Sequence, residues 1–186
     1  MKKIYIIAVI VITAFCMSKL YNMKTKSNPV ESRGIFISYI ECLNHLKNKS
    51  EIETKSEINN IIDNVKKYYF NRIYLQVRPF SDSIYNSEIF PSSYTIVSNQ
   101  GDKLSIDVLA YFISQAKKNN IELYAWINPY RISNDTDTTK LSNTNPAYKW
   151  LNTNNVKIIK DKGIFYNPSS EEVINLIIEG VKEIVR

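Results

Sequence analysis

The sequence predicts an α/β fold in which parallel strands are joined by crossover helices. Three runs rich in apolar, β-forming residues indicate the strands: residues 35–40, 72–77 and 121–127. Two stretches with helical periodicity, residues 54–69 and 105–119, separate these runs. Because the strands are almost continuously apolar, we expect both faces of the sheet to be covered, as is usual for parallel sheets.

Capping signals and apolar stripes define the two predicted helices. Thr54 and Glu57 have the spacing of a capping box, and apolar residues then recur at helical spacing up to Tyr69. In the second helix, apolar residues that include Leu109 and Phe112 fall on one face. Both stripes are typical of helices that pack against a core.

The last third of the chain predicts a long polar segment, a hairpin and a helix. Residues 133–155 are mostly polar, whereas residues 156–166 hold two apolar runs around a turn that contains Gly163. Ser169 and Glu172 form a second capping box, and a buried stripe that includes Val181 is predicted to follow them.

The first residues predict export. Residues 1–20 begin with two lysines and continue as an apolar run, which is shorter than the ~20 residues of a membrane span and suits a signal peptide or an anchor. Cleavage after Ser18, lipid attachment at Cys16 and retention as an anchor are all open. Polar residues 21–32 predict a linker, and residues 33–186 predict one domain. We therefore expect an exported protein, either extracellular or attached to the outer face of the cytoplasmic membrane.

Composition excludes several classes of partner. Basic residues exceed acidic ones by six, but the lysines are scattered and no arginine-rich block exists, which argues against nucleic-acid binding. Cys42 has no second cysteine at metal-type spacing, and His45 lies in a polar segment without nearby acids. The sequence therefore predicts no metal and no cofactor, and it leaves the oligomeric state open.

Polar side chains follow the second and third predicted strands, where Pro79 and Pro129 stop the strands because proline lacks an amide donor. In parallel α/β folds, ligands bind beyond the carboxyl ends of the strands. Amides, guanidinium groups and an aromatic ring suit a sugar or another polyol. The candidate binding residues are Gln76, Arg78, Asp82, Asn128, Tyr130 and Arg131.

Each of these residues also has a structural interpretation. Arg78 and Asp82 have the spacing of an ion pair that would tie a loop to the strand end, with Asp82 remaining ionised. Gln76 needs a hydrogen-bond partner inside an apolar strand, either a ligand or a neighbouring residue. Tyr130 has the properties either to stack on a sugar ring or to pack under the long polar segment.

Four motifs in this order make the sequence resemble the glycosyl-hydrolase-like 10 family. They are Arg-Gly-Ile-Phe at 33–36, Tyr-Leu-Gln-Val-Arg-Pro at 74–79, Ala-Trp-Ile-Asn-Pro-Tyr-Arg at 125–131 and Tyr-Asn-Pro at 166–168. Pro91-Ser92-Ser93 and Gln100-Gly101 continue the match. The resemblance covers residues 33–186.

The resemblance implies a TIM-type (β/α)8 barrel in a bacterial, exported or membrane-attached protein that acts on cell-envelope or extracellular polysaccharide. This chain departs from the family pattern at Ser92, where a tryptophan is usual, and at Val108, where a proline is usual. It also ends before the fourth strand, whose aspartate-rich motif holds the proposed catalytic carboxylate. We therefore expect a truncated barrel of three to four βα units, preceded by an N-terminal hydrophobic segment.

Glycoside hydrolysis generally needs two carboxyl groups, about 5 Å apart for retention or about 6.5–9.5 Å apart for inversion. Glu41, Asp82 and Glu88 lie near predicted strand ends, but no two of them form an obvious pair. No catalytic residue is assigned, and the chain alone is expected to be inactive. The alternative is a non-catalytic remnant that binds glycan. The sugar and the linkage are not predicted.

Overall fold

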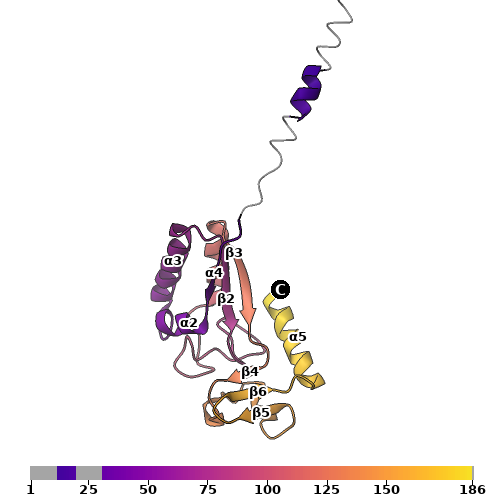
Figure 1. Cartoon of the computed structure of the whole chain (residues 1–186). Coiled ribbons are helices and arrows are strands. Elements are labelled where there is room, and N and C mark those ends of the chain that lie inside the picture. The colour runs from indigo at the N-terminus through magenta and orange to yellow at the C-terminus, as the bar shows by residue number, and fades with distance from the viewer. Residues whose placement is uncertain (1–11, 20–30, 186) are drawn as a thin grey trace, which may run out of the picture. The chain divides into compact units, whose positions relative to one another are not determined.

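The computed structural model describes residues 12–19 and 31–185 (Figure 1). The chain divides into two units, Met1–Ser32 and Arg33–Arg186. In the first unit, residues 12–19 are helical and exposed. None of the helices described is both long and apolar enough to cross a membrane. Most of the predicted signal or anchor (1–20) and linker (21–32) lies outside the described residues.

The second unit is built on a parallel three-stranded sheet. Its strands are β1 (Gly34–Ile37), β2 (Arg72–Arg78) and β3 (Glu122–Ile127), in the order β1-β2-β3. Both neighbouring pairs are parallel. The predicted α/β class with parallel strands is therefore confirmed, and its arrangement is compatible with part of a TIM-type barrel.

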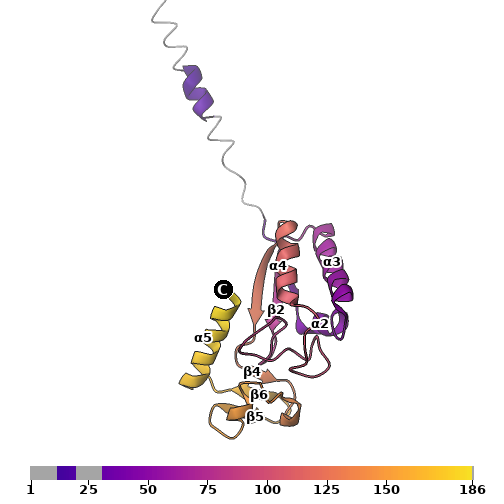
Figure 2. The ribbon, with the colours of Figure 1, turned by 180° about the vertical axis from the view of Figure 1, so that it is seen from behind.

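Two helices, α3 (Glu51–Lys67) and α4 (Val108–Lys118), cover one face of this sheet (Figures 1 and 2). Their buried apolar residues form one core with those of β2. The predicted capping box at Thr54 is wrong, because Ser50 and Glu53 have the same spacing one turn earlier. The Glu53 side chain accepts from the Ser50 amide at 2.9 Å, and the Ser50 hydroxyl accepts from the Glu53 amide at 3.4 Å.

The first strand ends at Ile37, three residues before the predicted end. Ser38 caps the short helix α2 (Tyr39–His45), and the Glu41 carboxylate accepts from the Ser38 amide at 2.8 Å. This capping box removes Ser38 and the residues after it from the strand. Glu41 is therefore part of a helix cap, and hydrogen bonding to Ser38 lowers its pKa.

A second, antiparallel sheet follows, with the order β4-β6-β5. The predicted hairpin is confirmed as β5 (Val156–Ile159) and β6 (Gly163–Tyr166). The strand β4 (Arg131–Ser133) ends at the start of the segment 133–155, which was predicted to be long and polar. The 3-10 helices Thr138–Lys140 and Tyr148–Trp150 form within this segment. Strand β4 pairs with β6, which lies about 30 residues later in the chain, and no local sequence pattern predicts this pairing.

The last helix, α5 (Glu171–Val185), contacts both hydrophobic cores. Val173 and Ile177 belong to the core of the second sheet, and Ile184 packs against the core of the first sheet. The Ser170 hydroxyl, rather than that of Ser169, accepts from a first-turn amide of the helix. Val181 is 41% exposed, so its prediction as a buried stripe residue is wrong.

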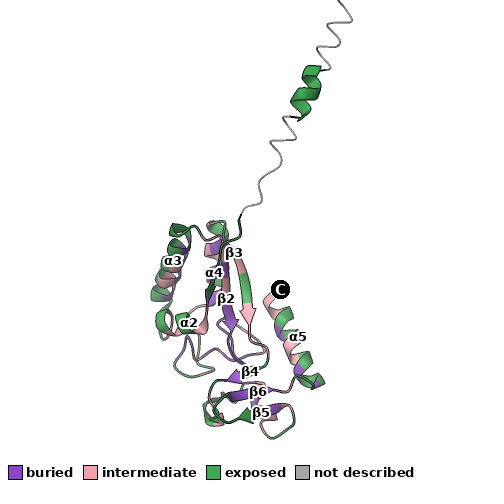
Figure 3. Ribbon diagram, in the orientation of Figure 1, coloured by how far each residue is buried: buried purple, intermediate pink, exposed green. Residues whose placement is uncertain are grey.

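The sheet face opposite α3 and α4 is open and aromatic. Phe36, Tyr74 and Tyr124 stack along it, with ring centroids 4.7 and 5.1 Å apart. Phe36 is 63% exposed and Tyr124 is 42% exposed. Figure 3 shows the contrast between largely buried β2 and the more exposed β3. The expectation that both sheet faces are covered is therefore wrong for the described residues.

Candidate functional site

An aromatic cluster lies beyond the carboxyl ends of the first two strands. Tyr39 is the first residue of α2 and follows the end of β1 by two residues, and Phe80 follows the end of β2 by two residues. Their rings meet edge to face at 5.2 Å between centroids. Tyr94 stacks on Phe80 at 5.5 Å with an interplanar angle of 25°. We call Tyr39, Phe80 and Tyr94 the rim cluster.

Two cations lie against the rings of this cluster. The Arg131 guanidinium, at the start of β4, is 5.7 Å from the centroid of Phe80. The Lys47 ammonium, shortly after α2, is 5.7 Å from the centroid of Tyr94. The stacked pair of Phe80 and Tyr94 is thus contacted by a cation on each ring, an arrangement that a ring quadrupole favours.

Tyr94 also lines a cleft of about 460 Å³, which we call the rim cleft. Its other polar lining includes Gln100, Asn134, Asp135 and Lys140. The Tyr94 hydroxyl donates to Asn134 Oδ1 at 3.2 Å, and Lys140 forms an ion pair with Asp135. A half-buried ring beside amide and hydroxyl groups is an arrangement that suits a sugar.

Asp82 lies behind the rim cleft and is completely buried. Gln100 Nε2 donates to its Oδ2 at 3.2 Å, and its Oδ1 has no hydrogen-bond partner among the described residues. Burial raises the pKa of Asp82 to about 7, although the hydrogen bond from Gln100 opposes the shift. Asp82 is therefore not the freely ionised carboxylate that the sequence predicts.

Arg78 is also buried, but on the side where β2 meets α5. Its guanidinium lies 3.9 Å from the centroid of Phe90, and Gly180 of α5 packs directly against it. Nε and Nη1 have no hydrogen-bond partner among the described residues. Burial lowers the pKa of Arg78, which the neighbouring Tyr85 hydroxyl partly opposes. Arg78 forms no ion pair with Asp82, so that interpretation is wrong.

Gln76 and Asn128 hold the strand ends together. Gln76 is buried, and its Oε1 accepts from the Tyr39 amide at 2.9 Å, which resolves its predicted need for a partner. Asn128 Nδ2 donates to the carbonyl of Pro79 at 3.1 Å, and its Oδ1 accepts from Trp126 Nε1 at 3.2 Å. Both amides therefore position backbone beside the rim cluster.

Tyr130 is exposed, and its carbonyl accepts from the amide of Tyr166 at 2.8 Å. Four of the candidate residues lie beside the rim cluster. Gln76 bonds to the amide of Tyr39, Asp82 interacts with Tyr94, and Asn128 bonds to the carbonyl of Pro79, which precedes Phe80. Arg131 contacts the ring of Phe80, and Tyr130 directly precedes Arg131 in the chain. Arg78 stands apart, because its side chain is enclosed by Phe90 and α5.

A buried hydrogen-bond network fixes the loops around the rim cleft. Gln100 Oε1 accepts from the Ser142 amide at 3.1 Å and from Asn145 Nδ2 at 2.9 Å. Asn145 also donates to the carbonyl of Ser81 at 2.8 Å and accepts from the Ser81 hydroxyl at 2.9 Å. Because this network joins the loop after β2 to the long segment after β4, it keeps the cleft walls in register.

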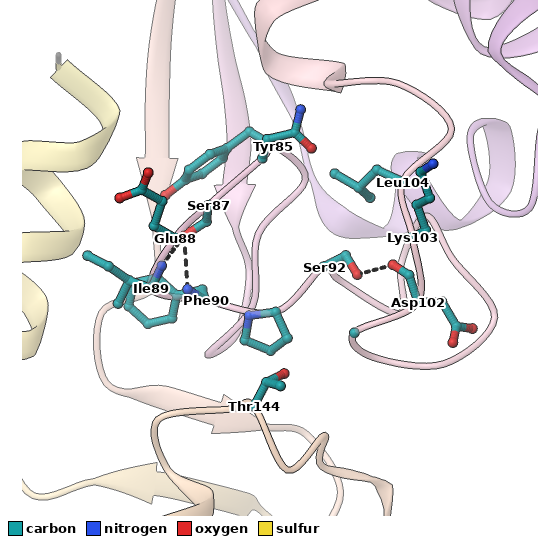
Figure 4. A pocket seen from close by; sticks show the side chains of 13 residues that line it. Tyr85, Ser87, Glu88, Ile89, Phe90, Ser92, Asp102, Lys103, Leu104 and Thr144 are labelled. Carbon is teal, nitrogen blue, oxygen red and sulfur yellow. Dashed lines mark hydrogen bonds between the residues drawn. The ribbon is translucent and has the colours of Figure 1, made fainter.

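A second cleft, of about 330 Å³, lies between the loop 85–92 and the loop 101–104 (Figure 4). Figure 4 shows Glu88 on one wall and Asp102 on the other, with Thr144 at the base. The wall residues Tyr85 and Phe90 are buried, so this cleft offers no exposed aromatic face. We therefore regard the rim cleft as the better candidate for sugar binding.

The three acids predicted near the strand ends serve different purposes. Glu41 caps α2, Asp82 is buried behind Gln100, and Glu88 is exposed in the second cleft. Within the described part of the chain, no group of three or more His, Cys, Asp or Glu side chains has the arrangement of a metal site. Among the residues that line the rim cleft, Asp135 is the one with a carboxyl group, and it pairs with Lys140, whereas Glu88 and Asp102 line opposite walls of the second cleft.

Sequence reasoning did not single out several residues of the site. Phe80, Tyr94 and Lys47 meet only in the folded chain, and Asn145 lies in the segment 133–155, which was predicted only to be long and polar. The available signals were indirect. Tyr94 directly follows the motif Pro91-Ser92-Ser93, and Gln100 belongs to the Gln-Gly motif.

Comparison with known proteins places this geometry in a wider group. Residues 31–186 match the family described as Glycosyl hydrolase-like 10. The chain is 31% identical over 183 residues to the glycosyl hydrolase YngK of Bacillus subtilis strain 168, covering 95% of this chain and 34% of YngK. It is 24% identical over 132 residues to the glycosyl hydrolase DigH of Escherichia coli strain K12, covering 64% of this chain and 29% of DigH. The chain spans about a third of the length of these curated relatives.

Proposed function

Because the chain belongs to the glycosyl hydrolase-like 10 family, as its motifs predicted, we propose that residues 33–186 form part of a TIM-type barrel that binds glycan at its strand ends. The parallel strands β1, β2 and β3 support three βα units of such a barrel, within the three to four that the sequence predicts. The rim cleft beyond their carboxyl ends is the proposed binding site.

The observation that carries this proposal is the position of Tyr94. Its half-buried ring lines the rim cleft, stacks on Phe80 and lies beside the polar groups of Gln100 and Asn134. The apolar face of a sugar ring packs on an aromatic side chain, while its hydroxyl groups need amide and hydroxyl partners. The rim cleft offers both within one concave surface.

The proposed ligand is a polysaccharide of the cell envelope or the extracellular space. The family and the names of the relatives YngK and DigH support a carbohydrate substrate. The basic start and the apolar run in residues 1–20 support export, so the protein would meet its ligand outside the cytoplasmic membrane.

A second candidate function is glycan binding without catalysis. The lining of the rim cleft favours it, because hydrolysis needs two carboxyl groups about one scissile bond and Asp135 is the one carboxylate among the residues that line this cleft. We therefore propose that this chain by itself binds glycan without cleaving it.

The test is co-sedimentation of the full chain with purified, protein-free bacterial cell-wall polysaccharide, together with an assay for new reducing ends. Tyr94→Ala is expected to weaken binding about tenfold, equivalent to about 1.4 kcal/mol. Tyr148→Ala is the matched control, because Tyr148 is an exposed tyrosine outside the rim cleft. Absence of binding by the wild-type chain would refute the proposed site, and new reducing ends would refute the non-catalytic proposal.

A further inference from the structure

Two basic side chains at the rim cluster have no acidic partner. Arg131 and Lys47 are half-buried, and neither forms an ion pair with any residue in the described ranges 12–19 and 31–185. Arg131 Nε is shielded from solvent and has no hydrogen-bond partner there. A partly desolvated cation without a partner is costly, so an anion that reaches it gains more than it would in water.

The acids around the rim cleft do not neutralise these cations. Asp135 is paired with Lys140, which also lies 4.0 Å from Asp137. Asp82 faces Tyr94 from behind, but it is completely buried and its pKa is raised by that burial. Lys47 and Arg131 therefore remain as positive charges, Lys47 beside the ring of Tyr94 and Arg131 beside the ring of Phe80.

We propose that the rim cluster and the rim cleft beside it select a polysaccharide whose sugars carry carboxylates. The selecting residues are Lys47 and Arg131, which contact the rings of the cluster but do not line the cleft itself. This inference rests on the proposed function, since it names the charge of the glycan that the same cleft would bind. A neutral sugar would stack on Tyr94 equally well but would leave both cations unmatched.

The two cations are suited to different parts of this task. The planar guanidinium of Arg131 binds a carboxylate through two parallel hydrogen bonds, and its contact with Phe80 restricts its orientation. The Lys47 ammonium is a point charge beside Tyr94, which favours any nearby anion without fixing its geometry.

The test compares one polymer in two charge states. Purified cell-wall polysaccharide is converted with carbodiimide and methylamine, so that its carboxylates become neutral amides while any phosphate groups keep their charge. Binding of the full chain to the native and the amidated polymer is measured by co-sedimentation, for wild type, Lys47→Gln, Arg131→Gln and Lys103→Gln. Lys103 is an exposed lysine in the second cleft, so Lys103→Gln controls for the loss of one positive charge.

The wild-type chain and Lys103→Gln are expected to bind the native polymer about tenfold more tightly than the amidated one. Lys47→Gln and Arg131→Gln are expected to lose most of this preference while they keep the affinity for the amidated polymer. Thermal unfolding verifies that each variant is folded. If Arg131→Gln is not folded, the polymer preference of Lys47→Gln alone tests the proposal.

Equal binding of both polymers by the wild-type chain would overturn the carboxylate inference and leave the proposed function intact. A preference that survives unchanged in Lys47→Gln and in folded Arg131→Gln would also overturn it. Failure to bind either polymer would remove the proposed function itself, and the inference with it.

Discussion

Replacing Asp82 by asparagine should change the pH dependence of stability. Burial raises the pKa of Asp82 from 3.8 to about 7 in the folded chain. Between these two values the folded chain holds a proton that the unfolded chain has released. The free energy of unfolding therefore falls as pH rises, by about 1.4 kcal/mol per pH unit for this one group. Over about three units the effect of Asp82 amounts to about 4 kcal/mol.

The assay is urea denaturation of the wild-type chain and Asp82→Asn at intervals from pH 4 to pH 8. Asparagine does not titrate, so any constant cost of the amide is the same at every pH. The stability of the variant relative to wild type should therefore rise by about 4 kcal/mol across this range, and it should level off above pH 7.

The exposed residue Asp63 on α3 provides the control, and Asp63→Asn should follow the wild-type curve. Carboxylates whose pKa values are lowered, such as Glu122 and Asp135, contribute the opposite slope at low pH. They are present in all three proteins and cancel in the difference. Parallel curves for wild type and Asp82→Asn would refute the assignment of a buried, protonatable carboxyl group behind the rim cleft.

Three further predictions concern packing, the buried network and the buried thiol. Gly180→Ala should destabilise the fold by about 1–3 kcal/mol in urea denaturation, because the new Cβ would lie 2.7 Å from Phe90 Cε2 and still closer to the Arg78 guanidinium. An increase in stability, as is usual when alanine replaces glycine in a helix, would contradict this. Asn145→Ala should cost about 2–3 kcal/mol in the same assay, because it removes three hydrogen bonds to Ser81 and Gln100 and leaves the carbonyl of Ser81 without its amide donor. The exposed neighbour Asn143→Ala should cost almost nothing. Cys42 should resist alkylation in the folded chain, since it is buried and burial raises its pKa to about 12, and it should react once urea unfolds the domain. Labelling is detected by mass spectrometry, and rapid labelling under native conditions would contradict the burial of Cys42.

The strand ends of the sheet were predictable because their causes are local. Pro79 and Pro129 lack the amide that a strand needs, and β2 and β3 end one or two residues before them. The same locality explains the errors at other boundaries. Ser50 and Thr54 carry equivalent capping signals, and only the packing of the extra turn of α3 decides between them.

The orientation of Arg78 was not predictable from the sequence. Gln76 pairs with Trp126 and Arg78 with Ile127, so β2 has one residue more than β3 between these pairs. Such a bulge re-aims the side chain that follows it, and here Arg78 packs under α5 instead of pointing to the rim. No residue in this stretch, such as a glycine, signals the bulge.

The composition of the rim cleft depends on contacts between distant segments. Ser81 and Asn145 are 64 residues apart in sequence, yet two hydrogen bonds join them and fix the cleft walls. The candidate residues were found because they follow strands. The aromatic residues that make the site suitable for a sugar lie in loops, and their meeting is a consequence of the whole fold.

The most direct test of glycan binding at the rim cleft is to map the backbone amide shifts of the full chain by NMR during titration with soluble cell-wall oligosaccharides. The largest shifts are expected at Tyr94, Gln100 and Asn134, which line the rim cleft, and at Tyr39 of the rim cluster. Shifts confined to Glu88 and Asp102 of the second cleft, or the absence of shifts at saturating oligosaccharide, would contradict it.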